Sequence, residues 1–198
     1  VRQGRASQAV KVLEAFGMDG WDEARRGQYH TVLAQTHLAN TRFDVSITPE
    51  ALRHALGSYR EALKYMGAAY ETGLAAAQVE YSLGDHEAAD KSAEQILAGK
   101  IGDRTKFGAL LLRAKIALSR ADYPVVETIM AEADAIANKG AALQEFYEVY
   151  AAAAMAQRKF SEATARVEQA IKAGGKNAER KLAPALANLK KRVAEQKR

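Results

Sequence analysis

Residues 84–97 read GDHEAADKSAEQIL, a turn-forming pair followed by a ring-bearing residue and a run of helix formers. Within this run, small or apolar residues return after four and then three positions, at Ala89, Ala93 and Ile96. That spacing puts the three side chains on one face of a helix. The segment therefore predicts a tight turn at Gly84-Asp85, followed by an amphipathic helix over Glu87–Leu97.

The same pattern recurs along the chain. Two further clear copies begin at Ala121-Asp122-Tyr123 and Arg158-Lys159-Phe160, and two weaker ones begin at Gly4-Arg5-Ala6 and Thr41-Arg42-Phe43. The turns at positions 4, 41, 84, 121 and 158 are spaced by 37, 43, 37 and 37 residues. A period in this range is typical of stacked helix pairs, which usually form binding surfaces rather than active sites.

Each clear copy predicts one helix before its turn and one after it. The expected helices are Tyr70–Leu83 and Glu87–Leu97, Phe107–Arg120 and Val125–Ala137, and Gln144–Gln157 and Ser161–Ala173. In the second copy, we expect a helix over Glu23–Ala39 and another that begins at Pro49, with Thr48 as its N-cap. The intervening Asn40–Ile47 is predicted to be an ordered loop, either a simple insertion or a functional element.

The start of the chain differs from the middle. Val1–Gln3 are typical of the end of a helix whose beginning is absent, so we expect a piece of a longer repeat protein or assembly. The helix expected over Gln8–Phe16 would then expose the apolar residues Val12, Leu13 and Phe16. Exposed apolar helix faces favour association, which leaves self-association open.

The end of the chain carries the excess positive charge. Net charge is +5, and Lys172–Arg198 holds nine basic and two acidic residues. A leucine-rich stripe in Asn177–Arg198 predicts a helix that caps the repeats, with a kink or restart at Pro184. The candidate basic patch on this helix comprises Lys181, Lys190, Lys191 and Arg192. Such a patch can belong to a terminal helix that is simply solvated. Its alternative function is binding of nucleic acid or an anionic lipid surface.

These repeats resemble the tetratricopeptide repeat. Its small residue midway along the first helix is matched by Ala34, Ala77, Ala114 and Ala151, and its Gly-Asp-Tyr-like turn best by Gly84-Asp85-His86 and Ala121-Asp122-Tyr123. The resemblance implies an all-α, right-handed α-solenoid of antiparallel helix pairs over residues 1–175, its first repeat truncated, with a basic capping helix over 176–198. The chain lacks the family's early Trp and its closing Pro.

The resemblance also implies a function. In such repeats the first helices line a concave groove that captures a partner peptide or helix, so the protein is expected to be an interaction scaffold or adaptor. The groove positions are Thr31, Gln35, Leu38, Leu74, Gln78, Tyr81, Leu111, Lys115, Leu118, Glu148, Ala152 and Met155. Family members that clamp a terminal carboxylate have Lys and Asn where this chain has Thr31, Gln35, Leu74 and Gln78, so that mode is not expected. Glu148 with Glu145 would make one end acidic.

Catalytic and cofactor chemistry is not predicted. The chain has no cysteine, which excludes disulfides, thiolate catalysis and Cys-ligated zinc but leaves a cytoplasmic and a periplasmic location equally open. His30 and His37 are seven residues apart and share a helix face, yet no third ligand is evident, so no metal site is expected. No apolar run approaches the ~20 residues that span a membrane. We therefore expect a non-enzymatic protein without a cofactor.

Overall fold

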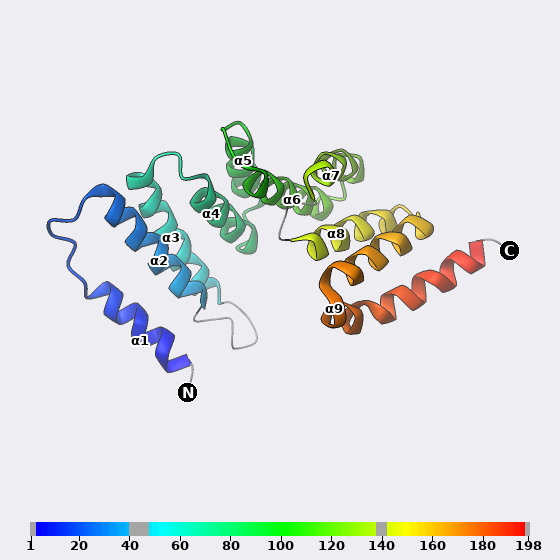
Figure 1. The fold of residues 1–198 in the computed structure, drawn as a ribbon, viewed down its shortest axis with the longest axis horizontal. Coiled ribbons are helices and arrows are strands. Elements are labelled where there is room, and N and C mark those ends of the chain that lie inside the picture. The colour runs from blue at the N-terminus through cyan, green and yellow to red at the C-terminus, as the bar shows by residue number, and fades with distance from the viewer. Residues whose placement is uncertain (1–2, 40–47, 138–141, 197–198) are drawn as a thin grey trace. The chain divides into compact units, whose positions relative to one another are not determined.

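The computed structural model describes residues 3–39, 48–137 and 142–196. All regular structure in these ranges is helical, and none of their helices is long and apolar enough to cross a membrane. The helices are α1 (Gln3–Glu14), α2 (Glu23–Ala39), α3 (Pro49–Met66), α4 (Tyr70–Ser82), α5 (His86–Leu97), α6 (Asp103–Ser119), α7 (Tyr123–Ala137), α8 (Leu143–Ala156) and α9 (Phe160–Gln196) (Figure 1).

The helices pack mainly as consecutive pairs: α2 with α3, α4 with α5, α6 with α7, and α8 with α9. The predicted all-α repeat of antiparallel helix pairs is therefore confirmed. The chain divides into two compact units, Val1–Gly99 and Lys100–Arg198. Residues 176–196 belong to the second unit.

The three clear copies of the repeat share one turn geometry. Gly84, Ala121 and Arg158 adopt φ values of 84°, 57° and 58°. In the first copy, the amide of Gly84 donates to the Tyr81 carbonyl at 3.0 Å and that of Asp85 to the Glu80 carbonyl at 3.0 Å. The same two hydrogen bonds recur, residue for residue, after α6 and α8. This is the Schellman arrangement, in which a left-handed residue satisfies the last carbonyls of a helix. The repeat read from the sequence is thus a repeat of backbone conformation.

Two helix starts have side-chain caps, and the predicted cap at Thr48 is confirmed. Thr48 Oγ1 accepts a hydrogen bond from the Ala51 amide at 3.2 Å, and Pro49 occupies the first helical position of α3. Asp85 Oδ1 accepts in the same way from the Ala88 amide at 3.2 Å at the start of α5. Each side chain satisfies one of the amides that have no partner in the first turn of a helix.

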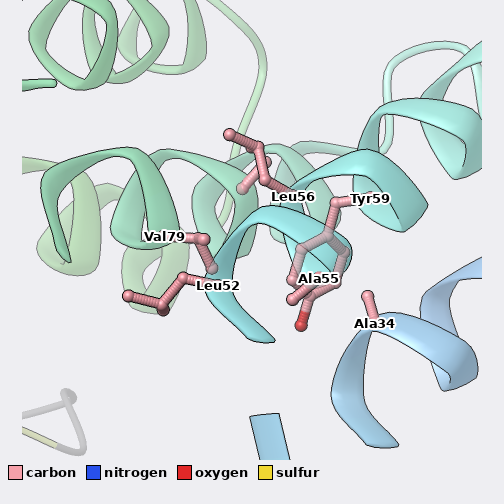
Figure 2. Close-up of a cluster of buried hydrophobic side chains, with 7 residues drawn as sticks. Ala34, Leu52, Ala55, Leu56, Tyr59 and Val79 are labelled. Carbon is pink, nitrogen blue, oxygen red and sulfur yellow. The ribbon is translucent and has the colours of Figure 1, made fainter. Parts of the chain in front are cut away.

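The core of the first unit lies between α2, α3 and α4. Figure 2 shows this cluster, which consists of Ala34, Leu52, Ala55, Leu56, Tyr59, Ala76 and Val79. The small residues of the repeat allow this packing, because Ala34 and Ala77 are 0% exposed and a larger side chain would push the helices apart. Their counterparts in the second unit, Ala114 and Ala151, are 0% and 3% exposed.

The second unit has two packing centres. The rings of Phe107 from α6 and Phe146 from α8 lie 5.5 Å apart and are almost completely buried. Beside them, residues 176–196, here called the C-terminal segment, fold back along α8 and the first half of α9 (Figure 1). The segment packs its leucine stripe, Leu182, Leu186 and Leu189, onto a cluster formed by Ala151, Ala154, Ala163 and Val167.

The reversal of α9 occurs at Gly175, whose φ of 63° and ψ of −150° are the non-helical angles inside this helix. The expected restart at Pro184 does not occur, because Pro184 lies inside the helix and the non-helical angles in α9 are those of Gly175. Proline fixes φ near the helical value, although its ring removes one backbone hydrogen bond and crowds the carbonyl of the preceding turn, so a kink at Pro184 stays a prediction.

The first copy of the repeat is also corrected. Residues Gly4-Arg5-Ala6 belong to α1, which runs without interruption over Gln3–Glu14. Because the helix continues through that triplet, the turn that marks the other copies is missing. The predicted exposure of Val12 and Phe16 is confirmed at 58% and 57%. The turn at Thr41-Arg42-Phe43 and the loop Asn40–Ile47 lie outside the described residues.

Candidate partner-binding surface

In the first unit, the predicted groove positions lie on α2 and α4. Gln35 and Gln78 are exposed, whereas Thr31, Leu38 and Leu74 are partly buried. Thr31 Oγ1 donates to the Gly27 carbonyl at 3.0 Å, and Leu38 packs against the core cluster. The side chains that this surface offers to a partner are therefore mainly the two glutamine amides, set among partly covered apolar groups.

Tyr81, at the end of α4, is partly buried, and its ring stacks on His86. The two ring centroids lie 5.0 Å apart with an interplanar angle of 17°. His86 follows the Schellman turn, so this stack fixes the Tyr81 ring against the start of α5. A ring that is already ordered loses little conformational entropy when a partner covers it.

In the second unit, the predicted positions lie on α6 and α8 and differ widely in exposure. Met155 is 44% exposed, and Leu118 and Ala152 are partly buried. Leu111 is only 5% exposed, so its predicted role as a groove contact is corrected to that of a core residue. The reason is that α6 packs against both α7 and α8, which leaves little of its surface open.

The charged positions of the second unit form two groups beside a hollow of about 500 Å³, which Gln144, Glu145, Glu148 and Lys181 help to line. Lys115 Nζ from α6 lies 2.7 Å from Glu145 Oε1 on α8. Lys181 Nζ from the C-terminal segment lies 2.8 Å from Glu148 Oε2, and Gln144 Nε2 donates to Glu148 Oε1 at 2.7 Å. The structure thus brings together two predicted groove residues and one residue of the predicted basic patch.

These contacts neutralise the end of the surface that the sequence suggested to be acidic. Burial raises the pKa of the Glu148 carboxyl, but the hydrogen bonds from Lys181 and Gln144 outweigh it, so the pKa lies below its usual value. Glu148 is therefore ionised at neutral pH and matched by Lys181. The hollow presents alternating charges of both signs rather than a negative field.

The remaining residues of the predicted basic patch are also engaged. Lys190 Nζ lies 2.9 Å from Glu168 Oε1, and Lys191 Nζ lies 3.9 Å from Glu195 Oε1. The Arg192 guanidinium lies 5.3 Å from the centre of the Phe160 ring, and its Nε donates to Asn188 Oδ1 at 3.2 Å. Lys190 and Lys191 thus pair with local carboxylates and Arg192 does not, and the alternative function in binding nucleic acid or anionic lipid stays a prediction.

Sequence reasoning missed a buried carboxylate. Glu80 in α4 is 6% exposed and contacts Arg60 from α3 and Ser92 from α5. The signal in the sequence is weak, since Glu80 is one charged residue beside the buried Ala76 and Val79. Its partners come from two other helices, which one-dimensional spacing does not reveal.

The histidines predicted to share a face of α2 pack against α3. The His30 ring stacks on Tyr65 at a centroid distance of 5.9 Å, and the His37 ring stacks on His54 at 5.3 Å. Within the described ranges, no group of three or more His, Asp or Glu side chains could hold a metal ion.

Comparison with known proteins supports the fold. No family model matches the sequence, and no curated protein matches it. The structure is similar to that of residues 41 to the end of MamA from Desulfovibrio magneticus RS-1. The TM-score is 0.64 at 15% identity, and the match covers 87% of this chain and 88% of the other. MamA contains tetratricopeptide repeats, so the chain has a fold of that helical-repeat type.

Proposed function

We propose that this chain is a protein-interaction scaffold, which binds an extended segment or a helix of a partner on the first helices of its repeat pairs. One observation carries the proposal. Residues at the predicted groove positions are exposed directly beside alanines that are buried in the same helices. Gln35 and Gln78 follow Ala34 and Ala77, which are 0% exposed, and Met155 at 44% follows Ala154 at 2%.

This pattern suits a partner-binding face. The buried alanines hold the helices close together, while the next side chain points to solvent and is not needed for folding. Glutamine amides can donate to and accept from the backbone of an extended segment. Met155 supplies a flexible apolar anchor, a residue type that adapts to differently shaped partners. An exposed apolar group of this size in a groove is a common source of binding energy.

The test compares variants that are matched in exposure. Met155→Asp changes α8, a first helix, and Val125→Asp changes α7, a second helix, at 44% and 40% exposure. Gln78→Arg on α4 and Gln95→Arg on α5 form a second matched pair, since both glutamines are exposed. Wild type and variants are used to retain proteins from a source lysate, and mass spectrometry identifies what each retains.

We expect at least one partner to be lost with Met155→Asp and Gln78→Arg but kept with the two controls. Its measured affinity should fall about tenfold or more, as for an anchor worth more than ~1.4 kcal/mol. Circular dichroism confirms that each variant is folded. A partner that binds all four variants equally well contradicts the proposal.

A further inference from the structure

The stacked rings of His37 and His54 connect α2 to α3. The rings face each other across the two helices, with centroids 5.3 Å apart and an interplanar angle of 20°. His37 is partly buried, whereas the His54 side chain is 59% exposed. Stacked imidazoles attract while they are neutral, but two imidazolium rings at this distance repel. The packing of α2 on α3 thus depends on the protonation of two imidazole rings.

Among the described residues, charged groups that act on this stack come from α1 and α3. Glu14, at the end of α1, acts on His37, and Glu50 Oε1 on α3 lies 3.9 Å from His54 Nε2. Burial lowers the pKa of His37, the nearby His54 lowers it further, and Glu14 partly offsets both. The carboxylates therefore do not cancel the cost of placing a proton on His37.

We propose that the His37–His54 stack is a proton-sensitive latch, which holds α2 against α3 when both rings are neutral and releases it when both are protonated. The latch acts on the core directly, because Ala34 and Leu38 of α2 pack in the cluster that includes Leu52 and Ala55 of α3. Release of α2 from α3 would also displace the exposed Gln35, which lies between Ala34 and Leu38 in the sequence. The effect on partner binding rests on the proposed function, but the latch itself does not.

The direction of the pH effect follows from linkage. The pKa of His37 is lowered in the folded state, so the unfolded chain binds a proton more readily. The contribution to stability is present above the ordinary value of 6.5 and is lost as the pH falls through the lower folded value. Carboxylates titrate mainly below about pH 5.5, so the window from about 7.5 to 5.5 isolates histidines.

The chain contains a reporter for the unit that holds the latch. Trp21 is its single tryptophan, and the Trp21 ring lies 5.8 Å from that of Tyr29 on α2. The experiment follows thermal unfolding of the full chain by Trp21 fluorescence across this pH window. It compares the wild type with His37→Asn, His54→Asn and the double variant. His86→Asn is the control, because that ring stacks on Tyr81 and not between α2 and α3.

We expect the unfolding midpoint of the wild type to fall as the pH decreases, and each single variant to flatten this fall. The double variant should match His37→Asn, and His54→Asn alone should flatten the fall less, because burial still lowers the pKa of His37 when His54 is replaced. His86→Asn should keep the wild-type slope, and His30, stacked on Tyr65, accounts for a residual slope in every variant. Because His54 is mostly exposed, His54→Asn provides the test even if His37→Asn impairs folding.

A second measurement examines the rings themselves. Proton–carbon NMR of the imidazoles should show His37 titrating at lower pH in the wild type than in the His54→Asn variant. Two outcomes would overturn the latch: the same slope of the unfolding midpoint in wild type and His54→Asn, or a His37 titration that His54→Asn leaves unchanged. Both measurements are independent of any partner, so they can fail while the proposed function stands.

Discussion

Nη2 of Arg60 lies 3.1 Å from Oε1 of Glu80, a carboxylate whose side chain is only 8% exposed. Ser92 Oγ donates to the other oxygen, Oε2, at 2.9 Å. One carboxylate in α4 therefore connects α3 and α5, and both of its oxygens have partners. A buried carboxylate is tolerated when both of its oxygens have partners. Removing one partner leaves an oxygen that has lost its water without gaining a hydrogen bond in the protein.

Ser92→Ala should destabilise the first unit by about 1–3 kcal/mol, the usual cost of leaving a buried polar atom without a hydrogen bond. Ser82→Ala is the matched control, because Ser82 is exposed and donates to the Gln78 carbonyl within its own helix. Denaturant unfolding followed by Trp21 fluorescence gives both values. Equal losses for the two substitutions would contradict the role assigned to Glu80, as would an undiminished effect of Ser92→Ala in a Glu80→Ala background.

The left-handed turns predict two stabilising substitutions. Ala121 and Arg158 have φ values of 57° and 58°, a conformation that costs a residue with a side chain roughly 1–2 kcal/mol. Ala121→Gly and Arg158→Gly should therefore each raise the free energy of unfolding by up to about 1 kcal/mol, after the entropy of the unfolded chain is included.

Ala131→Gly is the control for these two substitutions, because Ala131 is exposed in the interior of α7. There the same change of residue should destabilise the helix by about 0.5–1 kcal/mol. Urea unfolding followed by circular dichroism measures all three. Destabilisation at all three positions would mean that the repeated turn does not have the backbone conformation described.

The ion pair of Glu148 with Lys181 predicts a change in acid stability. The folded pKa of Glu148 is lowered, so its contribution to stability is present above about the ordinary 4.5 and is lost as the pH falls through the folded value. Lys181→Met removes a hydrogen bond and leaves the effect of burial, so the pKa should rise. Lys190→Met should leave it unchanged, because Lys190 pairs with Glu168. Carbon NMR of the Glu148 carboxyl distinguishes the two, and equal shifts would refute the assignment.

Local features were predicted well from the sequence because local physics determines them. The predicted helix Glu23–Ala39 matches α2 at both ends. Thr48 and Pro49 mark the start of α3, where the Thr48 side chain accepts a hydrogen bond from an amide only three residues further along the chain. The turn at Gly84-Asp85 likewise depends on contacts within one helix end. By contrast, Gly4-Arg5-Ala6 has the composition of the pattern but lies within the continuous helix α1, so composition alone predicted a turn that does not form.

The candidate site was predicted less well because it depends on contacts between helices. Lys181 and Glu148 are 33 residues apart in sequence, so the sequence placed them in two separate features, an acidic groove end and a basic patch. Leu111 matched the groove register of the repeat, yet packing on both sides of α6 buries it. Periodicity gives the face of a helix, but the neighbours of that face come only from the three-dimensional arrangement.

The angles of Gly175 have a consequence for the length of the molecule's last element. Its φ of 63° with a ψ of −150° falls in a region that is essentially restricted to glycine. The 37 residues of α9 would form a straight rod about 55 Å long if the helix were uninterrupted. The absence of a Cβ atom at one position thus allows these residues to double back as a helical hairpin. Any side chain at position 175 would favour the straight helix, in which the C-terminal segment no longer packs against α8.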